Sequence, residues 1–203
     1  MLVIGLTGGI GTGKSEVSRL LESLGATLIN ADQIGHEAYI PHSETWNLVV
    51  DAFGEGILQE SGEIDRRKLG AIVFSDPEEM AKLNGIMHPR MARMVSDRID
   101  HFREDGVEVV VVEAAVLFEA GWETLVDEVW STDSPVEAVV ERLQAARGIA
   151  PEEAQKRIAS QMDREERLDR SDVVVNNSGN VDDLERTVRG LWESRVNGRT
   201  ESR

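Results

Sequence analysis

Short apolar runs alternate with stretches of helical spacing along this chain. The runs predict five strands, at residues 2–7, 27–30, 107–112, 128–131 and 173–175. The third run has five valines in six residues, and a run that is apolar on both faces is typical of a central parallel strand. Glycines follow the first run at once, which predicts a turn directly after that strand.

The segments between these runs have the periodicity of amphipathic helices. In residues 15–24 the apolar side chains of Val17, Leu20, Leu21 and Leu24 fall on one helix face, and Gly25 ends the helix. Similar spacing predicts helices at residues 33–39, 135–147, 151–161, 163–168 and 181–195. Strands that alternate with helices predict an α/β fold, a three-layer doubly wound parallel sheet.

A long segment, residues 43–106, is expected to be mostly helical, with a turn-rich break near residues 54–56 and 61–62. Six apolar residues keep helical spacing there, at positions 80, 83, 87, 91, 94 and 99, and four of them are methionines. This stripe favours a helix face that packs in a core, although methionines also suit a pliable wall around a bulky ligand. His88-Pro89 stands inside the pattern, where proline marks either a kink or a helix boundary.

Composition excludes several classes of function. The net charge of −16 argues against nucleic acid or an anionic membrane as a partner. No segment approaches the roughly 18 consecutive apolar residues of a membrane-spanning helix, and we expect no signal peptide and a cytoplasmic protein. The absence of cysteine removes disulfides, cysteine-ligated zinc and thiol nucleophiles, and the four histidines lack metal-binding spacing.

Residues 8–15 read G-G-I-G-T-G-K-S and satisfy the phosphate-binding pattern G-x-x-x-x-G-K-[ST]. Glycines allow successive backbone N–H groups to point at an anion, and the following helix adds the positive end of its dipole. Lys14 can reach the β- and γ-phosphates, and the Ser15 hydroxyl is the usual protein ligand for Mg²⁺. We therefore expect the nucleotide to contact residues Gly9, Ile10, Gly11, Thr12, Gly13, Lys14 and Ser15.

The loop alone does not separate kinases from GTPases. Residues 32–35 and 51–54 both match D-x-x-G, which shows how common that pattern is, and the guanine-reading motif N-K-x-D is absent from the chain. A switch GTPase is therefore disfavoured. A nucleotide-gated binding module without turnover remains an alternative from another class.

Two acids follow strands, at the edge of the sheet where ligands bind in this class of fold. Asp32 can accept the proton of an attacking hydroxyl, or it can be the N-cap of the next helix. Glu113 ends the polyvaline strand and can hold Mg²⁺ through water, or it can be a cap or a solvated acid. Five arginines on the later helices suit phosphoryl oxygens, namely Arg142, Arg147, Arg157, Arg164 and Arg167.

Several spaced elements together resemble the dephospho-CoA kinase family, over residues 2 to about 192. They are Ile4 to Ser15, Asn30-Ala31-Asp32, Leu83-Asn84 with His88-Pro89, Leu117-Phe118-Glu119, Gln161 with Arg164 and Arg167, and Asp172 to Asn177 with Gly179. The resemblance implies ATP-dependent phosphorylation of the ribose 3′-hydroxyl of dephospho-CoA, which gives coenzyme A and ADP. A nucleoside-monophosphate or shikimate-type kinase is the nearest alternative.

The resemblance also implies roles for residues. Asp32 is expected to be the catalytic base, and Lys14 and Arg142 to stabilise the transferring phosphoryl group. Nucleotide contacts are further expected from Arg147, Asn177 and Gly179. Acceptor contacts are expected from Thr7, Asp32, His36, His88, Pro89, Glu113 and Leu117. Mg²⁺ and ATP are the expected cofactor and co-substrate, and the protein is expected to be a monomer or a weak homo-oligomer.

Within one domain of 203 residues, the resemblance implies four parts. They are a nucleotide-binding core at 1–32 and 107–196, a helical CoA-binding insertion at 33–106, a lid at 135–168 within the core, and a frayed tail at 197–203. Three departures from the family pattern stand out. Asn30 replaces the first acid of D-A-D, residues 114–116 lack the usual proline, and the lid residues Arg142 and Arg147 are five positions apart rather than four.

Overall fold

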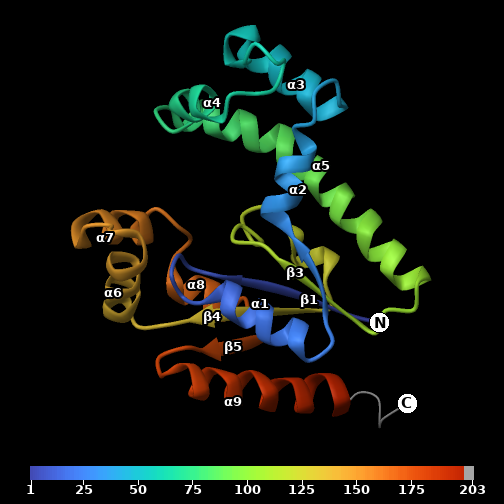
Figure 1. Cartoon of the computed structure of the whole chain (residues 1–203), viewed down its shortest axis with the longest axis vertical. Helices are drawn as coiled ribbons and strands as arrows, with labels where there is room; N and C mark the ends of the chain where they lie inside the picture. Colours follow the sequence, from blue (N-terminus) through green and yellow to red (C-terminus); the bar gives the residue numbers. More distant parts are fainter. Residues whose placement is uncertain (199–203) are drawn as a thin grey trace. The chain divides into compact units, whose positions relative to one another are not determined.

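The computed structural model describes residues 1–198 and contains a five-stranded sheet in the order β2-β3-β1-β4-β5 (Figure 1). β1 pairs in parallel with β3 and with β4, and β4 pairs in parallel with β5. The strands are β1 (Leu2–Gly8), β2 (Thr27–Asn30), β3 (Val109–Glu113), β4 (Glu128–Asp133) and β5 (Val173–Asn176). The predicted α/β fold with a parallel sheet is confirmed.

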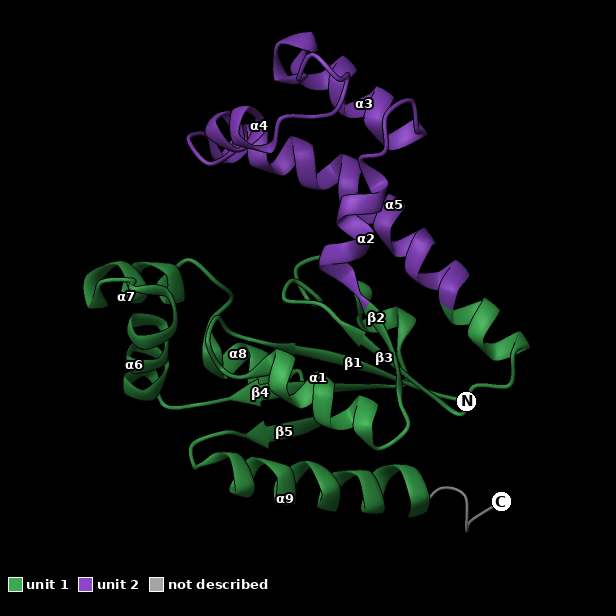
Figure 2. Cartoon of the chain, in the orientation of Figure 1, with its two compact units in different colours: residues 1–29, 99–203 green, residues 30–98 purple. Residues whose placement is uncertain are grey.

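The chain divides into two compact units (Figure 2). Unit 1 comprises residues 1–29 and 99–203, and unit 2 comprises residues 30–98, where the sequence predicted an insertion at 33–106. The helices of unit 1 are α1 (Lys14–Ser23), α6 (Val136–Arg147), α7 (Pro151–Ala159), α8 (Arg164–Asp169) and α9 (Val181–Trp192), with short helical turns η2 (Trp122–Leu125) and η3 (Glu193–Asn197). The predicted tail overlaps η3 at Asn197, and its residues 199–203 lie outside the described residues.

The core of unit 1 forms because the central strands are apolar on both faces. All seven residues of β1 and four of the five residues of β3 are buried. Val17 and Leu21 of α1 pack against this sheet together with Leu184 and Val188 of α9. Because the strands are parallel, their carboxyl ends share one edge of the sheet, which is where the P-loop (residues 8–15), Glu113, Asp133 and Asn177 lie.

Unit 2 is helical, as the sequence predicted. It contains α2 (Ala31–Ala38), α3 (Glu44–Phe53), the turn η1 (Glu55–Ile57), α4 (Arg66–Val73) and most of α5 (Pro77–Glu104). Leu83 and Met87 are buried in its core, and Met80, Met91 and Met94 pack against that core, so the methionine stripe is structural. α5 continues through Pro89, so the helix-boundary interpretation of His88-Pro89 is wrong. Within residues 1–198 no helix is long and apolar enough to cross a membrane.

Candidate active site

The P-loop joins β1 to α1 and requires glycine at its last turn. Gly13 is the N-cap of α1 and has the left-handed backbone angles φ 99° and ψ 19°. A Cβ atom at this position would lie 2.1 Å from Nδ2 of Asn177. Both the backbone conformation and the available space therefore exclude a side chain.

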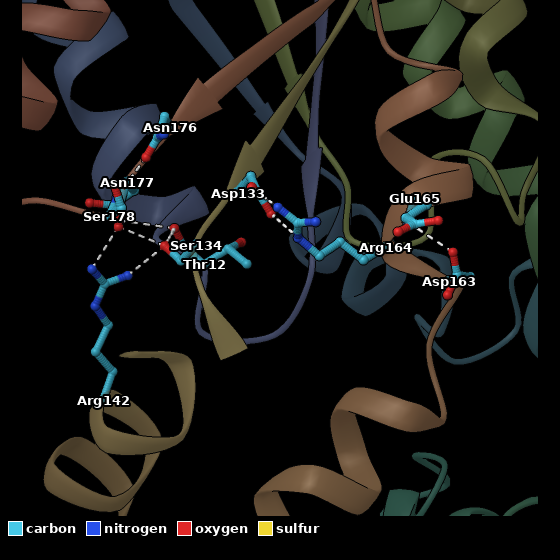
Figure 3. Close-up of polar contacts among 10 residues, drawn as sticks. All are labelled: Thr12, Asp133, Ser134, Arg142, Asp163, Arg164, Glu165, Asn176, Asn177 and Ser178. Atoms are coloured by element: carbon cyan, nitrogen blue, oxygen red, sulfur yellow. Dashed lines mark hydrogen bonds and ion pairs between the residues drawn. The ribbon is translucent and has the colours of Figure 1, made fainter. Parts of the chain in front are cut away.

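Side chains from the ends of β4 and β5 hold the loop in place. The Thr12 hydroxyl lies 2.8 Å from the Gly9 carbonyl, to which it donates, and 2.6 Å from the hydroxyl of Thr132. The Asn177 side chain donates to the Thr12 carbonyl over 2.9 Å (Figure 3). Thr12, Thr132 and Asn177 are all buried. Buried, fully bonded anchors of this kind keep the loop amides in position before any ligand arrives.

Lys14 and Ser15 open α1, and Ser15 faces Glu113 at the end of β3. The Glu113 carboxylate accepts hydrogen bonds from Ser15 (3.3 Å) and from Ser18 (2.9 Å). Because both donors are side-chain hydroxyls, Glu113 is not a helix cap, and it is half-buried. A hydroxyl and a carboxylate are the oxygen ligands that Mg²⁺ prefers, and such a site keeps water and substrate phosphates as its other ligands. Among the described residues no group of three acids, histidines or cysteines could hold a metal ion.

Asp32 lies in the first turn of α2, directly after β2. The N-cap of this helix is Asn30, whose side chain accepts the N–H of Gln33 over 3.1 Å. The N-cap interpretation of Asp32 is therefore wrong. The Asp32 side chain is exposed, and its carboxylate has no hydrogen bond or ion pair within residues 1–198. Asn and Asp serve equally well as N-caps, so the Asn30 departure leaves the cap intact.

Two arginines of the predicted lid bind residues at the carboxyl ends of β4 and β5 (Figure 3). Arg142 of α6 donates to the Ser134 hydroxyl (2.9 Å) and to the Asn177 carbonyl (2.8 Å). Arg164 of α8 forms a two-pronged pair with Asp133, at 2.8 and 2.5 Å. That carboxylate raises the pKa of Arg164 further above its ordinary value. Arg142 therefore contacts Asn177, the residue whose side chain holds the P-loop at Thr12.

A third arginine, Arg167, lies against the P-loop itself. A Cβ atom at Gly9 would lie 3.3 Å from one terminal nitrogen of Arg167 and 3.5 Å from Oε1 of Gln161. Gln161 also accepts the N–H of Ile10 over 2.7 Å. Arg167 is only 7% exposed, donates to the Met162 carbonyl, and forms no ion pair in the described chain. A buried cation without a carboxylate partner is costly and favours an anion beside it.

Arg167 and the P-loop line a cavity of about 350 Å³. Asp133 and Ser134 of the β4 end and Met162 also line this cavity. Sequence reasoning placed Arg167 among five candidate arginines without preferring it. The signal that separates it from the others is its burial, which depends on how α8 packs.

Other predicted residues lie in varied positions. Thr7 and Leu117, expected to contact the acceptor, are 1% and 0% exposed in this structure. Leu117 packs over Gly5, and the Thr7 hydroxyl donates to the Ala115 carbonyl. Arg147 is exposed at the end of α6, and Gly179 is exposed in the loop before α9. His36, His88 and Pro89 belong to unit 2, where His36 and Pro89 are exposed and His88 is half-buried.

Comparisons with known proteins agree on one family. The model of the dephospho-CoA kinase family matches residues 2–183. The dephospho-CoA kinase of Geobacter sulfurreducens is 45% identical over 96% of this chain and 99% of its own length. That of Carboxydothermus hydrogenoformans is 42% identical over 89% of this chain and 87% of its own length.

Solved structures show the same similarity. The dephospho-CoA kinase from Campylobacter jejuni has a TM-score of 0.74 and 26% identity, and the alignment covers 97% of this chain and 98% of that one. The protein TT1252 from Thermus thermophilus has a TM-score of 0.79 and 32% identity, with 96% and 97% covered. Shikimate kinase from Bacteroides thetaiotaomicron shares the fold alone, with a TM-score of 0.55 and 15% identity over 95% of this chain and 97% of that one.

Proposed function

This chain belongs to the dephospho-CoA kinase family, and we propose how its residues carry out that family's reaction. The enzyme transfers a phosphoryl group from ATP to dephospho-CoA, the last step of coenzyme A synthesis. Three groups of residues share the work: the P-loop with Arg167 binds the phosphates, Asp32 activates the acceptor, and Ser15 with Glu113 holds Mg²⁺.

The phosphate site rests on the buried, unpaired Arg167 beside Gly9. The amides of the P-loop and the ammonium of Lys14 bind the β- and γ-phosphates of ATP. As the γ-phosphoryl group moves, charge builds on its equatorial oxygens, and a guanidinium fork fixed at the loop stabilises that charge. The stabilising role that the sequence favoured for Arg142 therefore belongs to Arg167 in this proposal.

Arg142 acts on the reaction indirectly, through the P-loop. Its guanidinium fixes the Ser134 hydroxyl and the Asn177 carbonyl, and the Asn177 side chain in turn fixes the Thr12 carbonyl of the P-loop. Arg142 and Asn177 are thus positioning residues that keep the loop amides aligned.

Asp32 is the base. The ribose 3′-oxygen of dephospho-CoA attacks the γ-phosphorus of ATP, and the bond between that phosphorus and the β,γ-bridging oxygen breaks. The hydroxyl proton passes to the Asp32 carboxylate, and ADP leaves. The carboxylate is suited to this role because it is exposed and has no partner in the described chain. It also does not cap α2, because Asn30 is the N-cap of that helix.

Mg²⁺ would be held by the Ser15 hydroxyl and, directly or through water, by the Glu113 carboxylate, which already lie within hydrogen-bond distance of each other. When bound, Mg²⁺ supplies neutralising charge to the β- and γ-phosphates.

A coupled assay of ADP release over a panel of acceptors tests the function. We expect turnover with dephospho-CoA and at most slow turnover with nucleoside monophosphates or shikimate. The acceptor assignment is wrong if a nucleoside monophosphate or shikimate is phosphorylated and dephospho-CoA is not. ATP binding with no product from any acceptor would instead support the binding-module alternative.

A further inference from the structure

The short helix α8 and its C-cap carry three arginines at helical spacing. Arg164, Arg167 and Arg170 are three positions apart, and residues with this spacing are neighbours on a helix surface. The middle one, Arg167, is buried beside Gly9 of the P-loop. The outer two are exposed, and each pairs with a carboxylate outside α8. The outer arginines therefore connect the two ends of α8 to other parts of unit 1.

The first connection joins the start of α8 to the end of β4. Arg164 donates to both oxygens of the Asp133 carboxylate, over 2.8 and 2.5 Å (Figure 3). A two-pronged pair of this kind fixes the orientation of the guanidinium as well as its distance. Only 14% of the Asp133 side chain is exposed. Asp133 directly follows Thr132, which pairs with Gly8, so this contact links α8 to the strand residue beside the start of the P-loop.

The second connection joins the end of α8 to the segment that follows β3. Arg170 donates to the Glu123 carboxylate of η2 over 2.6 Å. The Arg170 guanidinium also lies over the Phe118 ring, 4.4 Å from its centroid. Phe118 is buried, and so is Trp122, the neighbour of Glu123. The partners of Arg170 are therefore themselves fixed by packing.

These two connections are important because little else holds α8. The helix has six residues, Arg164–Asp169, and isolated helices shorter than about 12–15 residues are marginal in water. Arg167 is the one buried residue of α8, so apolar packing contributes little to its placement. The N-cap Asp163 accepts the N–H groups of Glu165 and Glu166, and these bonds stabilise the first turn without attaching it to the sheet.

We propose that Asp133 and Glu123 are positioning residues for phosphoryl transfer, an inference that rests on the proposed role of Arg167. They hold α8 at both ends, so that the Arg167 guanidinium stays beside Gly9. A displacement of a catalytic group by about 1 Å can lower a rate by about 10²-fold. Arg164 acts in the same way, through its pair with Asp133, and is not itself a phosphate ligand.

Asp133→Asn and Arg164→Gln remove the same ion pair from its two sides. We expect each to lower kcat for dephospho-CoA phosphorylation by roughly ten- to hundredfold, and by similar factors. The Kd for Mg·ATP should change by less than about threefold, because the lost interaction belongs to the transition state. Glu153→Gln is the matched control, because it removes the carboxylate of an exposed ion pair on α7, and its kcat should equal that of the wild type.

A double-mutant cycle with Arg167→Gln separates positioning from a general structural role. If Asp133 acts through Arg167, adding Asp133→Asn to Arg167→Gln should lower kcat by no more than about twofold further. Equal factors for Asp133→Asn in the wild type and in Arg167→Gln would overturn the proposal. If Asp133→Asn does not fold, the same cycle is run with Glu123→Gln, which should lower kcat by roughly three- to tenfold in the wild type only.

The two single variants also distinguish positioning from direct binding by Arg164. A phosphate ligand at Arg164 would be released by Asp133→Asn. That variant would then keep or raise kcat while Arg164→Gln lowered it, and this result would overturn the proposal. Failure of the wild type to phosphorylate dephospho-CoA would instead refute the proposed function.

Discussion

Gly13→Ala should disable the P-loop by two effects that can be separated. The first is conformational, because Gly13 has a φ of 99° and an alanine there must adopt a left-handed conformation. The second is steric, because the new methyl group would lie 2.1 Å from Nδ2 of Asn177, well inside van der Waals contact. The amide cannot stay in place, and its hydrogen bond to the Thr12 carbonyl is lost.

The magnitudes follow from these contacts. A left-handed conformation costs a non-glycine residue about 1–2 kcal/mol. Leaving the buried Thr12 carbonyl without its donor costs about 1–3 kcal/mol more. The free energy of unfolding should therefore fall by roughly 2–5 kcal/mol. Binding of Mg·ATP should weaken severely because the loop amides no longer converge on the phosphates.

Gly25→Ala is the matched control at the other end of α1. Gly25 has a φ of 110°, and a Cβ atom there would meet nothing within 4 Å. This variant should lose only the conformational part, about 1–2 kcal/mol, and should bind Mg·ATP like the wild type. Urea unfolding measures the stabilities, and isothermal titration calorimetry measures the affinities.

Two outcomes would contradict these expectations. Equal losses of stability in Gly13→Ala and Gly25→Ala would show that the Asn177 contact contributes nothing. Wild-type affinity for Mg·ATP in a folded Gly13→Ala variant would show that the loop geometry does not determine nucleotide binding.

Two further predictions concern the chemistry. Arg167→Gln should lower kcat by roughly 10²- to 10³-fold, and Arg167→Lys should lower it by less. The control Arg157→Gln, on the exposed face of α7, should change kcat by less than about threefold. A wild-type kcat for Arg167→Gln would assign the stabilising role to another lid arginine. Asp32→Asn should lower kcat by about 10²- to 10⁴-fold and leave the Kd for Mg·ATP nearly unchanged. The control Asn30→Asp should keep both the stability and the rate, because aspartate also caps the helix. An unchanged kcat in Asp32→Asn would show that Asp32 is not the base.

Periodicity predicted the fold well because the central strands are buried by their own composition. The strand at 27–30 was placed at its observed bounds, and the other four strands were placed within two residues. The turn η2 lies in residues 114–127, to which no element was assigned, because that segment has neither strand nor helix periodicity. Local signals suffice where a segment is buried on both faces, and they fail where tertiary contacts shape a loop.

The choice between Asn30 and Asp32 shows a limit of a different kind. Both residue types cap helices equally well, so the sequence could not decide which one starts α2. The structure decides it with one hydrogen bond, from the Gln33 N–H to the Asn30 side chain. Once the cap is assigned to Asn30, Asp32 has no structural task among the described contacts, which strengthens its interpretation as the base.

The negative net charge is at odds with a polyanionic substrate, and the surroundings of single arginines resolve the conflict. Several arginines on helix surfaces, such as Arg157 and Arg189, have carboxylate partners one turn away. Arg167 at the P-loop is buried and has no carboxylate partner within the described chain. Distant acids are screened beyond about 8 Å at physiological salt, so a phosphate at the P-loop experiences this cation rather than the total charge. Affinity for an anion therefore depends on where a buried, unpaired arginine lies, and total charge is a poor guide to it.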